Sequence, residues 1–247
     1  MQSFSYQLWA WLVVLVCVPT HFFIALFCIF TPNFMKNHRK LARLFIKIIA
    51  KSMKLNVIVD GLEHIPTDKP CIFMANHSSL IDILVMVIGI PCHFNFIAKK
   101  ELFWVPFIGL DMVFGGDFLI DRHSPRKAKK CLKKVENRLK KGWNMLIFPE
   151  GTRSTTGELL PFKRGAFKLA VETDAYIIPC YINGSDKIVQ KNSLKPTPGN
   201  VYIYFSHPII PKQDSTQKTS TKNLTSETFD EIQTLKNVHQ KKNLVHQ

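Results

Sequence analysis

The sequence predicts an α/β domain with a largely parallel twisted sheet flanked by helices, preceded by an N-terminal two-helix membrane-associating segment. Three observations lead to this prediction. Residues 8–30 are almost entirely apolar, residues 36–54 carry a basic stripe at helical spacing, and short β-branched or aromatic runs alternate with helical patterns from residue 57 onward. Such alternation is typical of parallel sheets with crossover helices. We therefore expect a membrane-associating segment (1–55), an α/β domain (56–211) and a polar tail with one short helix (212–247).

The charge and the cysteines limit the classes of partner and of site. The 247 residues carry a formal net charge of +15, which favours an anionic partner: nucleic acid, anionic lipid head groups or a phosphorylated substrate. Membrane lipid is favoured over nucleic acid, because the sequence contains no recognisable basic-plus-aromatic nucleic-acid module. The six cysteines form no CxxC pair, so we expect reduced thiols in a cytoplasm-like compartment, with neither disulfides nor a metal site.

The apolar run Leu8–Phe30 is long enough to cross a bilayer. As a helix it would extend roughly 34 Å, against about 30 Å for the hydrocarbon core. No Lys or Arg precedes it and no small-residue cleavage site follows it, which argues against a removable signal peptide. Pro19, Thr20 and His21 interrupt its middle, so a kinked or re-entrant anchor remains an alternative to a simple span.

A basic amphipathic helix is predicted after the break at residues 31–33. Its basic residues recur at steps of three and four, with apolar residues on the other face. They are Lys36, Lys40, Arg43, Lys47, Lys51 and Lys54. We expect this helix to lie on a membrane surface with its lysines toward lipid phosphates; the alternative is a core-packed helix with a solvated basic face. Positive residues at this position predict that the following domain is on the cytoplasmic face.

Seven strands are predicted in the rest of the chain, with helices between several of them. The expected strands are 57–59, 71–75, 94–98, 117–121, 145–149, 176–180 and 201–205. One helix should begin near Ser79, and another at Ser124-Pro125, where an N-cap residue is followed by a proline in the first turn. A third should cover about 163–172, and a last, weakly amphipathic one about 225–238.

Polar clusters follow three of the predicted strands. His77 follows strand 71–75, Arg122 follows strand 117–121, and Glu150-Gly151-Thr152-Arg153 follows strand 145–149. Ligands of such sheets bind beyond the carboxyl ends of the strands. We therefore expect these three clusters to form one site.

His77 and Asp82 are candidates for acid–base chemistry. Positions five apart on one helix differ by roughly 140°, so the two meet only if His77 lies in a loop and Asp82 in the helix that follows. The segment 79–82 fits this geometry because it resembles a capping box with Ser79 as N-cap. A histidine oriented by an aspartate is a general base for a hydroxyl. The alternative is that Asp82 only satisfies the helix end and His77 bonds to the backbone.

The other two clusters are candidates for binding a phosphorylated polyol. Gly151 lets a ligand approach the backbone, Arg153 offers a planar two-pronged donor, and Glu150 and Thr152 can hydrogen-bond hydroxyls. The alternative is a tight turn with an internal Glu–Arg pair. Arg122 either binds phosphate or pairs with a neighbouring acid such as Asp121.

The order of the motifs resembles a known family. NHSSLID, KKELFWVPFIG, GGDFLIDR, FPEGTRS, PFKRGAFKLA and YIIPCYING follow one another between about residues 57 and 210. This order is similar to that of the glycerolipid acyltransferases, and most similar to that of the 1-acylglycerol-3-phosphate acyltransferases. One departure lies around Pro179, where Tyr176, Ile178 and Cys180 replace the usual small aliphatic residues. The acyl-chain and acceptor preferences of the family are therefore a weaker guide to this chain than the reaction that the family catalyses.

The resemblance implies direct acyl transfer without an acyl-enzyme. His77, oriented by Asp82, would deprotonate the sn-2 hydroxyl of lysophosphatidic acid, which attacks the thioester of an acyl-CoA or acyl-carrier protein and gives phosphatidic acid. Arg122 and Arg153 would hold the phosphate. The remaining site residues, Glu150, Gly151 and Thr152, would position the glycerol. No metal or cofactor is implied, and the implied location is a membrane rich in anionic lipid, with the catalytic domain on its cytoplasmic face.

Three other functions remain open. The acceptor could be glycerol-3-phosphate or another lysophospholipid. An acyl thioesterase would use water in place of the lipid hydroxyl and would need no phosphate site. A non-catalytic membrane lipid-binding protein would explain the basic helices but would leave the His77–Asp82 pair without a role.

Overall fold

A seven-stranded sheet forms the centre of the molecule. The computed structural model describes residues 4–189, 195–211 and 217–245. The strand order is β1-β7-β6-β2-β5-β3-β4, and every neighbouring pair is parallel except β6 and β7. The predicted α/β fold with a largely parallel sheet is thus confirmed, and β2, which carries the His77 loop at its end, lies in the middle of the sheet.

All seven predicted strands are present, with small shifts at their ends. Their bounds are β1 Leu55–Asp60, β2 Cys71–Ala75, β3 Phe94–Lys99, β4 Phe118–Ile120, β5 Asn144–Ile147, β6 Tyr176–Asn183 and β7 Gly199–Phe205. The central strands are short apolar runs because both faces of the sheet are covered.

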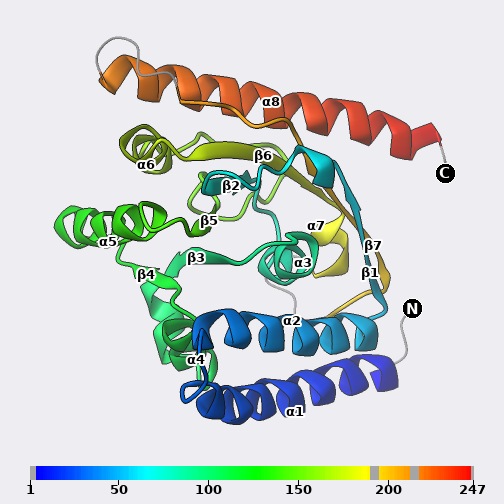
Figure 1. The fold of residues 1–247 in the computed structure, drawn as a ribbon. Helices are drawn as coiled ribbons and strands as arrows, with labels where there is room; N and C mark the ends of the chain where they lie inside the picture. Colours follow the sequence, from blue (N-terminus) through cyan, green and yellow to red (C-terminus); the bar gives the residue numbers. More distant parts are fainter. Residues whose placement is uncertain (1–3, 190–194, 212–216, 246–247) are drawn as a thin grey trace.

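Helices cover both faces of the sheet (Figure 1). On β2, Cys71, Phe73 and Ala75 belong to one buried cluster, and Ile72 and Met74 to the other, as the two-residue repeat of a strand requires. The first cluster packs against α1 (Phe4–Cys28), α2 (Phe34–Ser52) and α3 (Asp82–Gly89). The second packs against α5 (Pro125–Leu139), α6 (Gly165–Thr173) and α8 (Gln217–Val245).

Helices α1 and α2 lie antiparallel along one side of the molecule, with α1 outermost (Figure 1). α1 is long and apolar enough to cross a membrane. The expected interruption does not break it, because α1 is helical through Pro19 and the Thr20 hydroxyl donates to the Val16 carbonyl at 2.7 Å.

The basic stripe of α2 is only partly as expected. Its lysines are exposed, but the Arg43 guanidinium donates to the carbonyls of Val87 and Ile90 at 2.8 and 2.6 Å. Arg43 was counted in the basic stripe, but it binds carbonyl groups that the end of α3 leaves without helical partners. The helix therefore has the packed face and the exposed basic face of the second alternative, and contact of its lysines with a membrane surface stays a prediction.

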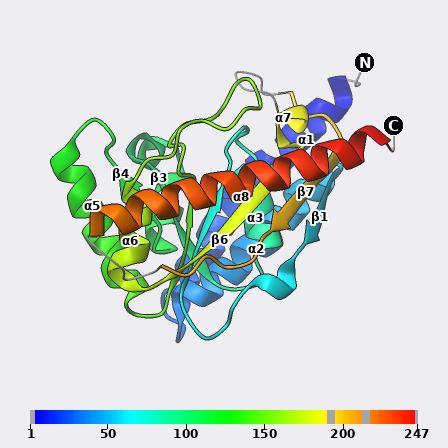
Figure 2. The same ribbon diagram turned by 90° about the horizontal axis from the view of Figure 1, so that it is seen from above.

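Several helical elements differ from the sequence-based expectation. The C-terminal helix α8 spans Gln217–Val245, much more than the predicted 225–238, and crosses over β6 (Figure 2). The 3₁₀ helices η1 (Leu62–His64) and η2 (Lys100–Trp104), and helices α4 (Ile108–Phe114) and α7 (Ser185–Ile188), were not predicted. They are too short for a hydrophobic repeat to reveal them.

A polar cluster of two buried histidines and a half-buried aspartate joins α1, α2 and α4. One carboxylate oxygen of Asp111 is 3.1 Å from Nδ1 of His21 and 2.9 Å from Nε2 of His38. Burial raises the pKa of Asp111, but hydrogen bonds from the two imidazoles outweigh it and bring this pKa to about 2. The three side chains come from three separate helices, so their spacing in the sequence gave no sign of the cluster.

Candidate active site

The loop that carries His77 leaves the carboxyl end of β2 and is pinned to β6. The Asn76 side-chain amide donates to the Ile182 carbonyl at 3.0 Å and its oxygen accepts from the Ile182 N–H at 2.7 Å. Farther along, the Ser79 hydroxyl donates to the Val189 carbonyl at 2.6 Å. These bonds involve buried groups, so the direction in which the loop leaves the sheet is fixed.

His77 and Asp82 are in contact across the turn from loop to helix. Nδ1 of His77 lies 2.7 Å from Oδ2 of Asp82, which also accepts the backbone N–H groups of Ser78 and Ser79, each at 2.8 Å. Asp82 is completely buried, while the His77 side chain is 17% exposed. Because a carboxylate only accepts, Nδ1 carries the proton and Nε2 is left as the basic nitrogen.

The predicted capping box is only half present. Asp82 accepts the Ser79 N–H as expected, but the Ser79 hydroxyl is turned to Val189 and does not cap the helix. α3 begins at Asp82, three residues later than the sequence suggested. Asp82 therefore both satisfies the helix start and orients His77, and the role of His77 as a general base stays a prediction.

Glu150 supports the same loop from β5. One carboxylate oxygen accepts the backbone N–H of His77 at 2.9 Å, and the other accepts that of Leu160 at 3.2 Å. The side chain is 3% exposed, and burial, together with the nearby charge of Asp82, raises its pKa to about 7 despite those two hydrogen bonds. The carboxylate therefore points into the protein and holds two main-chain segments together.

The segment after β5 holds His77 on two further sides. The Ser154 N–H donates to the His77 carbonyl at 2.8 Å. The Phe148 ring stacks on the imidazole, with a centroid distance of 4.2 Å and an interplanar angle of 19°. Main chain and ring of His77 are thus fixed by residues that follow about seventy positions later.

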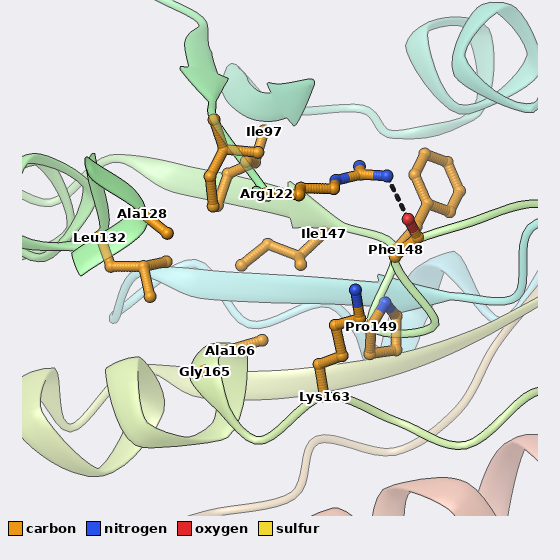
Figure 3. A pocket seen from close by; sticks show the side chains of 12 residues that line it. Ile97, Arg122, Ala128, Leu132, Ile147, Phe148, Pro149, Lys163, Gly165 and Ala166 are labelled. Atoms are coloured by element: carbon orange, nitrogen blue, oxygen red, sulfur yellow. Dashed lines mark hydrogen bonds between the residues drawn. The ribbon is translucent and has the colours of Figure 1, made fainter. Parts of the chain in front are cut away.

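Two cations meet at the turn that contains Gly151. Arg122 donates from Nη1 to the Gly151 carbonyl (Figure 3). Gly151 has φ of 71°, and a Cβ at this position would lie 2.8 Å from Nζ of Lys163. Glycine is required here for its positive φ and because the Lys163 amine lies against its backbone.

A cavity extends from these cations into the protein. It has a volume of about 280 Å³. Arg122, Phe148 and Lys163 lie at one end, and Ala128 and Leu132 of α5 at the other (Figure 3). The remaining lining residues are largely apolar: Ile97, Ile120, Ile147, Pro149, Gly151, Gly165 and Ala166. A cavity with a cationic mouth and an apolar interior suits an amphipathic anion.

The structure brings the predicted residues together to different degrees. His77, Asp82 and Glu150 are directly connected by hydrogen bonds, and Arg122 joins them through the turn at Gly151. Thr152 is exposed and Arg153 half-buried in the loop that follows. Substrate binding by Arg122, Glu150, Gly151, Thr152 and Arg153 stays a prediction.

Sequence reasoning gave no functional role to Asn76, Phe148 or Lys163. Asn76 directly precedes His77, and Phe148 stands two residues before Glu150; this nearness in the sequence is the only signal for them. Lys163 lies in the PFKRG motif, twelve positions after Gly151, and nothing in that spacing shows that its amine returns to the turn.

Among the residues that the structure describes, one group of side chains has the chemistry of metal ligands. The imidazoles of His21 and His38 and the carboxylate of Asp111 have donor atoms within 4.8 Å of one another. They belong to α1, α2 and α4 and not to the elements that carry His77, and their mutual hydrogen bonds account for the arrangement.

Comparison with known proteins gives a consistent picture. The sequence profile of the family described as Acyltransferase matches residues 56–183. A chloroplastic 1-acyl-sn-glycerol-3-phosphate acyltransferase of Arabidopsis thaliana is 36% identical over 201 residues, covering 80% of this chain and 54% of its own length. A Saccharomyces cerevisiae 1-acyl-sn-glycerol-3-phosphate acyltransferase is 33% identical over 235 residues, covering 93% of this chain and 74% of its own.

A solved structure has the same fold. The crystal structure of the 1-acyl-sn-glycerophosphate acyltransferase PlsC of Thermotoga maritima matches with a TM-score of 0.79 and 28% identity. The match covers 94% of this chain and 95% of that one. By contrast, the chain spans about half the length of the chloroplast relatives.

Proposed function

The chain belongs to the acyltransferase family, and from that premise we propose that it transfers a fatty acyl group from an acyl thioester to the sn-2 hydroxyl of 1-acylglycerol-3-phosphate. The product is phosphatidic acid. The alignments with 1-acyl-sn-glycerol-3-phosphate acyltransferases of Arabidopsis thaliana and Saccharomyces cerevisiae cover most of the chain. The observation that carries the proposal is the contact of 2.7 Å between His77 Nδ1 and Asp82 Oδ2, beside a cavity with a cationic mouth.

In the proposed reaction His77 is the general base. Nε2 takes the proton of the acceptor hydroxyl as its oxygen attacks the thioester carbonyl, and Asp82 stabilises the imidazolium that forms. The C–S bond then breaks, and the thiolate leaves with the proton returned from His77. Phe148 restricts the imidazole to one plane, so the nitrogen is oriented before the substrate binds.

The acceptor phosphate is proposed to bind at the mouth of the cavity. Arg122 and Lys163 lie on either side of the Gly151 turn, and Arg153 follows two residues later. A guanidinium and an ammonium at one turn suit a phosphate. The apolar interior suits an acyl chain, because burying methylene groups there is favourable at about 0.8 kcal/mol for each.

Glu150 is proposed to act through His77, and Gly151 and Thr152 to approach the glycerol. Both carboxylate oxygens of Glu150 already accept protein N–H groups. We place the domain at a membrane, on its cytoplasmic face, with α1 as the anchor and the exposed lysines of α2 near anionic lipid.

Thiol release from acyl thioesters tests the proposal. Purified wild-type and His77→Ala protein would receive long-chain acyl-CoA or acyl-carrier protein with lysophosphatidic acid, glycerol-3-phosphate, a neutral lysolipid or no acceptor. We expect release that requires both His77 and lysophosphatidic acid. If thiol release required another acceptor, that acceptor would replace lysophosphatidic acid as the proposed substrate. Thiol release without any acceptor would indicate a thioesterase. The absence of thiol release with both donors would exclude catalysis.

A further inference from the structure

An exposed apolar patch lies on η2 and α4, outside the candidate active site. It consists of Phe103, Trp104, Val105, Ile108, Leu110 and Val113, whose side chains range from 37% to 81% exposed. Trp104 is the most exposed, at 81%. Contiguous exposed apolar side chains of this size mark an interaction surface, because leaving them in water is unfavourable.

The η2–α4 patch is continuous with the exposed face of α1. The Phe107 ring, at the start of α4, packs against Phe22 and Phe23 of α1 at centroid distances of 5.5 and 6.0 Å. Beside these contacts, Phe23 and Phe27 of α1 are 55% and 74% exposed. Because α4 and α1 lie beside each other at one end of the molecule (Figure 1), the two sets of exposed apolar side chains are neighbours.

Polar bonds fix α4 against the two N-terminal helices. Asp111 accepts hydrogen bonds from His21 of α1 and His38 of α2 at 3.1 and 2.9 Å. Because Asp111 is turned inward, Ile108, Leu110 and Val113 remain on the outside of α4. The patch thus has a fixed position relative to α1, the helix that is apolar and long enough to cross a bilayer.

The charges around the η2–α4 patch suit lipid head groups. Lys36 and Lys40 are exposed and flank His38 in α2, the residue whose imidazole contacts Asp111 of α4. Lys99 and Lys100, where η2 begins, are also exposed, and they pair with Glu101 at 3.6 Å and Asp121 at 2.8 Å. Apolar and aromatic side chains with a border of lysines are typical of proteins that insert into the interface of an anionic membrane. A protein partner would not require this continuity with α1.

We propose that the η2–α4 patch inserts into the membrane interface beside α1, as a separate lipid-contacting element of the catalytic domain. Trp104 lies among the lipid head groups and acyl chains, and α8, at the opposite end of the molecule, stays in water (Figure 1).

Insertion would place the active-site mouth close to lipid. η2 follows β3 directly, and Lys100 at its start pairs with Asp121 at 2.8 Å, next to Arg122. A lysolipid leaving the bilayer at the η2–α4 patch would thus bring its phosphate toward Arg122. This consequence, unlike the insertion itself, rests on the proposed function.

Tryptophan fluorescence tests the insertion. Trp9, Trp11 and Trp143 would be replaced by Phe, leaving Trp104, and the protein would be reconstituted in anionic phosphatidylcholine–phosphatidylglycerol vesicles. The matched control lacks all four tryptophans and carries Thr234→Trp on the exposed face of α8. We expect brominated acyl chains to quench Trp104 at least twofold and to leave the α8 tryptophan unquenched.

Two outcomes would overturn the proposal. Quenching of Trp104 by aqueous acrylamide but not by brominated lipid would place it in water. Protection of Trp104 from both quenchers would indicate a protein contact instead.

A second measurement needs no substitution and therefore does not depend on how the variants fold. Wild-type protein in vesicles with a photoreactive group on the acyl chain should be labelled in residues 100–114 as well as in α1, and not in α8. Labelling confined to α1 would reject the proposal. Neither experiment depends on catalytic activity, so a failure of the acyltransferase assignment would leave the result interpretable.

Discussion

The carboxylate of Glu150 accepts a hydrogen bond from the backbone N–H of His77 at 2.9 Å. The same carboxylate holds the Leu160 N–H at 3.2 Å, so one buried side chain connects the candidate base to the loop that carries Thr152 and Arg153. An amide at this position has one accepting oxygen and must direct its NH₂ group at the other N–H. From this relationship we expect Glu150 to act as a positioning residue, a role that can be tested separately from substrate contact.

Glu150→Gln should lower kcat by roughly 10–100-fold with little change in KM, because the His77 backbone moves while the phosphate-binding cations remain. Steady-state kinetics with lysophosphatidic acid as the varied substrate would measure both constants. The control is Glu63→Gln, an exposed carboxylate on η1, which should leave both unchanged. A rise in KM at constant kcat would instead favour direct contact between Glu150 and the acceptor.

The pKa of Glu150 also predicts how stability depends on pH. Its pKa in the folded protein is about 7, above the ordinary 4.5, so the folded state retains a proton that the unfolded chain releases. This contribution to stability is fully present below about pH 4.5 and is lost as the pH rises through 7. Relative to Glu150→Gln, the wild type should lose up to about 3 kcal/mol over this range. Thermal unfolding midpoints in detergent between pH 4.5 and 8 would measure the difference, and a gain with rising pH would contradict it.

The elements that the sequence predicted correctly are those with a strong local pattern. The run Cys71–Ala75 reads as a covered strand, and Ser124 before Pro125 marks a helix start; both are present as expected. The sequence predicted the location of the site from the polar residues that follow three strand ends, and it predicted no more of the site than that. The contact of Lys163 with Gly151 and the bond from Glu150 to the His77 N–H depend on loop conformation, which no residue repeat encodes. The helix predicted over about 225–238 is present, but the full length of α8 was missed because its packing against β6, and not its weak pattern, stabilises it.

Asp82→Asn should reduce turnover by about 10²–10⁴-fold, since the amide can donate to Nδ1 and so favour the tautomer that removes the base from Nε2. The pH profile of kcat should change as well, which a purely structural role would not produce. Ser79→Ala is the matched control, because it removes the bond of 2.6 Å to Val189 from the same loop without touching the imidazole. An equal loss of turnover in the two variants would assign the effect to the loop and not to the His77–Asp82 pair.

Gly151→Ala should raise the KM for the phosphorylated acceptor and destabilise the protein by about 1–2 kcal/mol. The backbone penalty follows from φ of 71°, and the added methyl group would displace Lys163, whose Nζ would lie 2.8 Å away. Gly157→Ala separates the two effects, because it has φ of 75° and no described atom within 4 Å of the added Cβ. We expect it to show the loss of stability in thermal unfolding without the change in KM. Equal KM changes in both variants would show that Lys163 does not take part in binding.

Arg122 and Lys163 at the cavity mouth, together with Arg153 in the loop that follows, should distinguish phosphorylated from neutral acceptors. Arg122→Ala, Arg153→Ala and Lys163→Ala should each raise the KM for lysophosphatidic acid by roughly 10-fold or more, the effect of removing a charge-assisted hydrogen bond made in the ground state. Lys168→Ala is the control, because Lys168 is exposed on α6 and pairs with Glu172 at 3.6 Å, outside the mouth. It should leave KM unchanged.

A neutral lysolipid makes the test of the phosphate assignment sharper. If the cations bind phosphate, the three substitutions should remove most of the preference for lysophosphatidic acid over a neutral lysolipid of the same chain length, while kcat/KM for the neutral lipid stays nearly constant. Parallel losses for both acceptors would mean that the cations hold the turn around Gly151 and not the substrate.

The role of Arg122 needs a separate test, because its Nη1 already donates to the Gly151 carbonyl. Arg122→Lys then decides its role: an ammonium keeps the charge for phosphate but loses the planar fork that reaches both partners. Recovery of the KM by lysine would therefore support phosphate binding, and failure to recover it would support a role in holding the turn.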